Sequence, residues 1–230
     1  MNLIIEVQSF QDFVDHLTTL SPESIFINSE LKVGTLLNCL LEPISMDVIL
    51  KFTEKLNNLN NPTRMYYFSP YTAYSLFFTT HIDFTEFILR NQIPADVNYF
   101  IIPIIIKSRW VLILINLETL KITIFENQRV LNPIMNFEEM QLFKQKIEAF
   151  TTCLLGIEFL LFNSIEIILT EQVQGAFDCG PYLMYFMIQL FADVNNHQFE
   201  QFVPINSNLS QYIQFVQDFR MTMVVFLLDM

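Results

Sequence analysis

The chain has 230 residues, of which 52% are hydrophobic, and a formal net charge of -12 at pH 7. This length suits one domain with a sizeable core, so we expect residues 1–230 to form a single domain. Only 12 lysines and arginines are scattered along the sequence, which argues against a nucleic-acid partner, because binding to phosphate backbones rests on clustered basic side chains.

The N-terminal segment lacks the pattern of a secretory signal. The stretch MNLIIEVQSF has no basic region and reaches Glu6 almost at once. Later apolar runs are short, since Pro103 interrupts YFIIPIII and Asp229 ends MVVFLL, whereas a membrane-spanning helix needs roughly 18 to 20 apolar residues. We therefore expect an intracellular protein, cytoplasmic or nuclear, with no membrane partner.

The first hundred residues are predicted to be mainly helical. Apolar side chains recur every three or four positions over residues 10–20 and again over residues 44–59, which is typical of amphipathic helices. The stretches YYFSPYTAYSLF and HIDFTEFILRNQ follow, and they indicate two short helices joined near Thr79.

The middle of the chain changes to short stretches rich in isoleucine and valine, as expected for strands. The first two are apolar almost throughout, which predicts strands covered on both faces. A helix, FEEMQLFKQKIEAF, separates the first three predicted strands from the last two. The five predicted strands are YFIIPIII, RWVLILINL, LKITIFEN, IEFLLF and IEIILT.

Two more helices complete the pattern. An apolar helix is predicted after Gly180, and residues 209–228 have the spacing of an amphipathic one. Helices packed on a central sheet in this order predict an α+β domain. Dinucleotide, phosphate-loop and HExxH motifs are absent from the sequence, and the three cysteines have no metal-ligand spacing. We therefore expect no cofactor, no metal and a reducing compartment.

The segment QGAFDCGPY sets Cys179 directly before the apolar run LMYFMIQLF. Pro181 suits the first turn of a helix, where its missing N–H has no partner to lose, so Cys179 is predicted at a helix N-terminus. The positive end of the helix dipole stabilises a thiolate, and Gly180 keeps the approach uncrowded. This is the setting of a nucleophile, although a cysteine can also serve as a small buried hydrophobe.

This segment resembles the nucleophile motif of the ubiquitin-like-protein protease family, in which Gln-x-Asn-x-x-Asp-Cys-Gly opens the central helix. The stretch RWVLILINLETLKITIFEN is similar to the His-Trp strand of that family and to the acid at the end of the next strand, and the family spacing is kept between Arg109 and Glu126. Similarity to the family extends over nearly the whole chain and is greatest to the compact deneddylating branch. It rests also on LLEPISMDVIL, YYFSPYTAYSLF and KQKIEAF.

The resemblance implies a papain-like cysteine protease fold, with a central mixed sheet flanked by helices and the nucleophile at the N-terminus of a buried helix. It implies that Cys179 is the nucleophile, Glu126 the acid and Trp110 a substrate-binding residue. The implied partner is a ubiquitin-like modifier of the SUMO or Nedd type, or its conjugates, which such thiol isopeptidases cleave after a Gly-Gly tail.

The chain departs from the family pattern at three places. Arg109 stands where the family has its catalytic histidine, and arginine is protonated at any biological pH, so it cannot act as the base. Val173 stands where the family has its oxyanion glutamine, which leaves Gln174 or Gln172 as the candidate donor. The tryptophan that covers the tail in the family is replaced by Pro43 or a gap.

Two classes of function remain open at this stage. In the first, the chain keeps the fold and the modifier groove without efficient hydrolysis and acts by binding, with Glu126 paired to Arg109 as a salt bridge. In the second, it is an active cysteine protease with an unusual base, either deSUMOylating or deneddylating, or a viral maturation protease of the adenovirus type. We interpret His16, His81 and His197 as surface residues.

Overall fold

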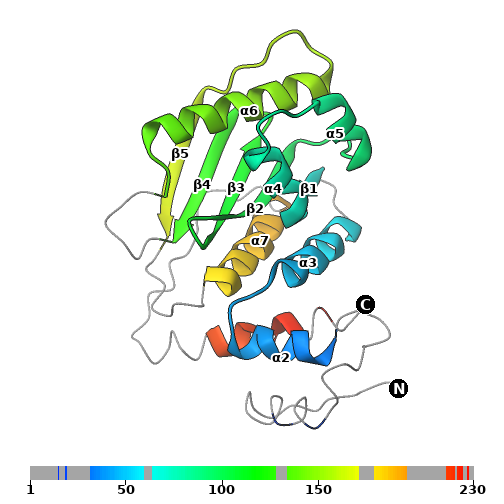
Figure 1. The fold of residues 1–230 in the computed structure, drawn as a ribbon, viewed down its shortest axis with the longest axis vertical. Coiled ribbons are helices and arrows are strands. Elements are labelled where there is room, and N and C mark those ends of the chain that lie inside the picture. The colour runs from blue at the N-terminus through cyan, green and yellow to red at the C-terminus, as the bar shows by residue number, and fades with distance from the viewer. Residues whose placement is uncertain are drawn as a thin grey trace.

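The computed structural model describes residues 15, 19, 32–59, 64–127, 134–170, 179–195, 216–220, 222–224 and 227. Within these ranges, helices lie on both sides of a five-stranded sheet (Figure 1). The helices are α2 (Val33–Leu41), α3 (Met46–Asn58), α4 (Pro70–Phe78), α5 (Phe84–Arg90), α6 (Phe137–Leu155) and α7 (Cys179–Asn195). The strands are β1 (Met65–Tyr67), β2 (Tyr99–Ile106), β3 (Arg109–Asn116), β4 (Lys121–Asn127) and β5 (Ser164–Thr170).

The sheet is mixed, and its strand order β1-β2-β3-β4-β5 follows the chain. The strands β2, β3 and β4 form an antiparallel meander, whereas β1 and β5 add to its two edges in parallel. A two-residue turn joins β2 to β3, and its residues Lys107 and Ser108 have φ values of 48° and 63°. Tight turns with positive φ match the twist of paired strands, so this turn fixes the register in which Arg109 faces Ile106.

Side chains of β3 alternate between two covered faces of the sheet. Trp110 and Leu112 belong to the core on the side of α7, whereas Val111 and Ile113 belong to the core on the side of α6. Figure 1 shows α6 along one face of the sheet and α7 against the other. The expectation that these apolar strands are covered on both faces is confirmed, as is the mixed sheet flanked by helices.

Phenylalanine supplies much of the core on the α6 side. The ring of Phe150 is fully buried at the centre of α6. The rings of Phe68, Phe84, Phe87 and Phe100 lie 5.7 to 6.4 Å from it, mostly edge to face. Because aromatic pairs in such geometry add to the free energy gained by burial, this cluster joins α5, β2 and the connection between β1 and α4 to α6.

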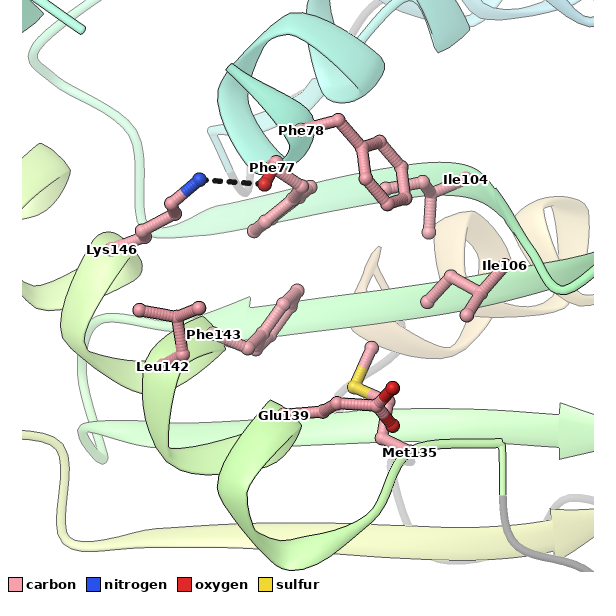
Figure 2. Close-up of a pocket in the computed structure, with 9 residues that line it drawn as sticks. All are labelled: Phe77, Phe78, Ile104, Ile106, Met135, Glu139, Leu142, Phe143 and Lys146. Atoms are coloured by element: carbon pink, nitrogen blue, oxygen red, sulfur yellow. Dashed lines mark hydrogen bonds between the residues drawn. The ribbon is translucent and has the colours of Figure 1, made fainter. Parts of the chain in front are cut away.

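A groove of about 200 Å³ lies on the α6 side, between α4, β2 and α6 (Figure 2). Apolar side chains such as Phe78 and Ile104 line it. At one end, Lys146 Nζ donates hydrogen bonds to the carbonyl oxygens of Phe77, at 2.6 Å, and Thr79, at 2.9 Å. Burial lowers the pKa of Lys146, and its ammonium group satisfies carbonyls that the end of α4 leaves without helical partners.

Most elements predicted from the sequence are present. The helix predicted over residues 44–59 is α3, and the two short helices after it are α4 and α5. The first three predicted strands are β2, β3 and β4, IEIILT is β5, and the apolar helix after Gly180 is α7. The predicted helix over residues 10–20 and most of the one over 209–228 lie outside the described residues, although residues 216–220 and 222–224 are helical.

One local prediction failed, and two elements were missed. The stretch IEFLLF, residues 157–162, is irregular rather than a strand. It follows Gly156, which ends α6 in the left-handed conformation with φ 63°, and the backbone N–H of Phe162 donates to the Glu148 carboxylate instead of to a neighbouring strand. The short strand β1 and the helix α2 were not anticipated. β1 has three residues, too few to show an alternating pattern.

Among the described helices, none is by itself long and apolar enough to cross a membrane. The pair α2 and α3 meets the length and composition requirement only when taken together, and the two are bent by 100° at their junction.

Candidate active site

Cys179 is the first residue of α7, as the proline at position 181 predicted. Its side chain is half-buried and packs against the core on the α7 side of the sheet. The next residue must be small, because a β-carbon built on Gly180 would lie 2.7 Å from the β-carbon of Ile44. The N-terminus of α7 therefore approaches the α2–α3 connection (residues 42–45) as closely as backbone permits.

Trp110 contacts the same connection from the sheet. Its side chain is buried, and its indole Nε1 donates a hydrogen bond of 3.1 Å to the carbonyl oxygen of Ile44. Ile44 thus lies between Gly180 and Trp110, with its side chain against one and its carbonyl bonded to the other. The carbonyl satisfies the one polar atom of the buried indole ring.

A small cavity separates Cys179 from the sheet. It is lined by Trp110, Phe125, Tyr182 and Phe186 among others, and its volume is about 10 Å³. One water molecule needs a cavity of at least roughly 10 to 15 Å³ on this measure. The described walls beside the thiol therefore pack closely on one another.

Arg109 and Glu126 form an ion pair, as expected from the sequence. Arg109 Nη1 lies 3.5 Å from Glu126 Oε1. The Glu126 side chain is 2% exposed and that of Arg109 is 25% exposed. The other carboxylate oxygen of Glu126 accepts a hydrogen bond of 3.3 Å from the backbone N–H of Ile134. The acid position is therefore occupied by a buried carboxylate held by a cation and by backbone.

Glu126 and Cys179 contact residues of different cores, since Glu126 accepts from the backbone of Ile134 on the α6 side. Glu126 follows the strand alternation of Ile122 and Ile124, which lie in the core on the α6 side. Cys179 packs against the core on the α7 side. Within the described ranges, no hydrogen bond or ion pair connects Cys179 to Arg109 or to Glu126. The described residues thus include a half-buried thiol at the start of α7 and, apart from it, a buried carboxylate paired with a guanidinium that cannot accept a proton.

The remaining sequence candidates are placed as follows. His81 is exposed in the connection between α4 and α5, which agrees with its interpretation as a surface residue. His16, His197, Gln172 and Gln174 lie outside the described residues, as does Val173.

Sequence reasoning missed one polar residue close to the site. Arg220 is 5% exposed, and its Nη1 donates to the carbonyl oxygens of Cys39 and Glu42. The signal that could have revealed it is a single arginine within the apolar pattern of residues 209–228, because a buried arginine needs acceptors. Ile44 was missed too, because the sequence does not show which backbone carbonyl will accept a hydrogen bond from a distant side chain.

Comparisons with known proteins place this arrangement in context. The family model described as the Ulp1 protease family, C-terminal catalytic domain, matches residues 46–215. No curated protein sequence matches the chain. The solved structures that match this chain have low sequence identity to it, so their similarity shows a shared fold and nothing more.

Three of these structures show the extent of the likeness. The Ulp1 protease domain in complex with SMT3, the yeast ortholog of SUMO, has a TM-score of 0.68 and 16% identity, over 99% of this chain and 100% of that one. The catalytic domain of the Chaetomium thermophilum Ulp1-like SUMO protease has a TM-score of 0.56 and 13% identity, over 99% and 92%. The Xanthomonas campestris effector XopD bound to ubiquitin has a TM-score of 0.52 and 10% identity, over 78% and 90%.

The first prediction concerns the ion pair. Breaking a fully buried pair costs about 3–5 kcal/mol because a charge is left without its partner. A quarter of the Arg109 side chain is exposed, so Arg109→Met should lower the free energy of unfolding by less, about 1–3 kcal/mol. Adding Glu126→Gln should recover part of the loss. Denaturant titration of the two single variants and the double variant measures the coupling.

Lys121→Met is the matched control for the ion pair, because Lys121 pairs with Glu166 at an exposed position. Its effect should stay below about 1 kcal/mol. Additive effects of Arg109→Met and Glu126→Gln would show that the buried pair contributes nothing as a pair.

The second prediction orders the three thiols by their rate of alkylation. Burial raises the pKa of Cys39 to about 12, so Cys39 should remain almost unlabelled up to pH 9. Cys153 lies in the last turn of α6 and Cys179 at the start of α7, and both are half-buried. Because helix N-termini favour a thiolate and C-termini disfavour it, Cys179 should react fastest. Mass spectrometry after partial labelling of the native protein measures the order, and slower labelling of Cys179 than of Cys153 would contradict it.

Proposed function

The chain belongs to the Ulp1 protease family, and from this membership we propose that it binds a ubiquitin-like modifier of the SUMO or Nedd type, or its conjugates, with hydrolysis impaired. The proposal treats residues 1–230 as one catalytic-domain unit. It assigns Cys179 to the nucleophile position, Glu126 to the acid position and Trp110 to the substrate-binding surface, and it requires no metal or cofactor.

The ion pair between Arg109 and Glu126 carries the proposal. In a thiol protease, a neutral imidazole takes the thiol proton and later protonates the leaving amine, and a carboxylate orients that imidazole. Here the carboxylate of Glu126 lies 3.5 Å from a guanidinium. Arg109 has no lone pair to offer in either step, so both proton transfers lack their carrier.

Support for the partner class comes from the solved relatives. The Ulp1 protease domain has been solved with SMT3 and XopD with ubiquitin, so this fold presents a surface that such modifiers fit. In this chain, a Gly-Gly tail that approaches Cys179 along Trp110 would meet the α2–α3 connection, where Ile44 contacts both Trp110 and Gly180.

A second candidate is an active cysteine protease with an unusual base, either deSUMOylating or deneddylating, or of the adenovirus type, which uses glutamate as its acid. One observation favours it, namely that Cys179 still opens α7. Gln174 or Gln172 would then supply the oxyanion donor.

The third prediction tests binding. Calorimetry against SUMO, a Nedd-type modifier and ubiquitin should detect binding of at least one of the three. Cys179→Ala should bind with nearly the affinity of the parent, because the contact is between surfaces and no covalent bond contributes. Cys153→Ala is the matched control, since it removes an equally exposed thiol at the far end of α6. Absence of binding to all three modifiers would reduce the relationship to one of fold alone.

The fourth prediction tests the missing base. The parent should show little or no release of fluorophore from a modifier with a Gly-Gly tail. Arg109→His should gain partial activity, because a positioned general base contributes about 10²–10⁴-fold in rate. Adding Val173→Gln should raise it further by supplying an oxyanion donor. Recovery should stay partial, since the tail-covering tryptophan is absent and substrate positioning is weaker.

Arg90→His is the control for that experiment, because Arg90 is an exposed arginine in the last turn of α5. It should leave the rate unchanged. Efficient cleavage by the parent, with a lower rate for Arg109→His, would overturn the assignment of Arg109 to an inactive position and establish the second candidate.

A further inference from the structure

Arg220 bonds to the end of α2. Its side chain is 5% exposed, and Nη1 donates to the carbonyl oxygen of Cys39 at 2.5 Å and to that of Glu42 at 2.9 Å. These carbonyls belong to the last turn and to the C-cap of α2. A helix leaves such groups without internal partners, and a cation near them is favoured by the helix dipole. Arg220 therefore caps α2 from a segment almost two hundred positions away in the chain.

The capped end of α2 leads directly to the candidate active site. Only residues 43–45 separate Glu42 from α3, and Ile44 is the middle one. The carbonyl of Ile44 accepts the hydrogen bond from Trp110, and its side chain lies against Gly180. Any displacement of the end of α2 must therefore move a residue that contacts the sheet and the N-terminus of α7 together.

The connection is not held by the next helix in the same way. Ser45 is the N-cap of α3, yet its side chain accepts no capping hydrogen bond. The two helices are bent by 100° at this point, so the direction of α2 is not set by continuation into α3. A guanidinium suits the position, because the two N–H groups on Nη1 have fixed directions and donate to the two carbonyls, whereas a lysine is a flexible point donor.

We propose that Arg220 is a positioning residue, which holds the α2–α3 connection against Trp110 and Gly180 and thereby sets the wall of the site beside Cys179. Its effect on a modifier rests on the function proposed above. Its effect on the site itself does not, because Trp110 and Cys179 report on the wall without any ligand.

The test uses Arg220→Met, which keeps an apolar stem and removes the donors, and Arg220→Lys, which keeps the charge. Trp110 is the only tryptophan of the chain, so tryptophan emission reports on its indole alone. With Arg220→Met, the emission should shift to the red and acrylamide should quench it more strongly. Alkylation of Cys179 should become faster by about tenfold or more, on the order of the effect of removing one hydrogen bond to a charged group. Arg220→Lys should fall between this variant and the parent.

Two controls separate positioning from general loss of stability. Arg90→Met removes an exposed arginine and should change none of the readouts. The rate for Cys153, at the end of α6, should match that of the parent in every Arg220 variant, whereas partial unfolding would raise it together with that of Cys179. Ile44→Ala should reproduce the changes at Trp110 and Cys179 with the Arg220 contacts intact.

For the modifier, affinity should fall about tenfold with Arg220→Met, since a wall that is no longer held must be ordered on binding. The inference is overturned if a folded Arg220→Met protein keeps the emission of Trp110 and the alkylation rate of Cys179. If Arg220→Met does not fold, Arg220→Lys decides by the same two readouts, and parent-like values overturn the inference. If the parent binds no modifier, the proposed function is contradicted. The role of Arg220 is then decided by the emission of Trp110 and the alkylation rate of Cys179 alone.

Discussion

The burial of both faces of the central sheet is the constraint on which the rest of this structure depends. With α6 on one face and α7 on the other, successive residues of β3 must enter different cores. Trp110 joins the α7 side, where it meets Ile44 and the cavity beside Cys179, while Arg109 pairs with Glu126, whose carboxylate belongs to the α6 side.

The ion pair shows how the fold accommodates an arginine at position 109. A guanidinium at position 109 has a buried carboxylate within reach, so the charge of each residue is compensated without change to the strands. The nucleophile position depends on other contacts, namely the start of α7 and the close approach of Gly180 to Ile44. The residues that stabilise the fold are thus different from those that would carry out catalysis. Family membership alone therefore does not establish activity.

The site wall shows how local contacts combine over long sequence distances. Ile44 joins β3 to α7, and Arg220 joins the end of α2 to the segment at residues 216–220. Each hydrogen bond among these contacts has a backbone carbonyl as its acceptor. Such acceptors are present at every residue, so the sequence does not mark which of them will receive a buried donor.

The sequence by itself determined the features that are local in the chain. The hydrophobic pattern identified α3 to α7 and β2 to β5. Each helix buries one apolar stripe and each strand buries one or both of its faces, so the pattern is present within the segment itself. The Cys-Gly-Pro order placed Cys179 at a helix start, and the resemblance to the family, which put Arg109 and Glu126 at the base and acid positions, predicted their ion pair. Only the tertiary structure decided that IEFLLF has no partner strand, that three residues suffice for β1, and that Arg220 and Ile44 lie at the site. Those outcomes depend on which distant groups meet. A strand forms only beside another strand, and a buried donor is stable only beside an acceptor. The residues of the strand or of the donor do not show where in the chain that partner lies.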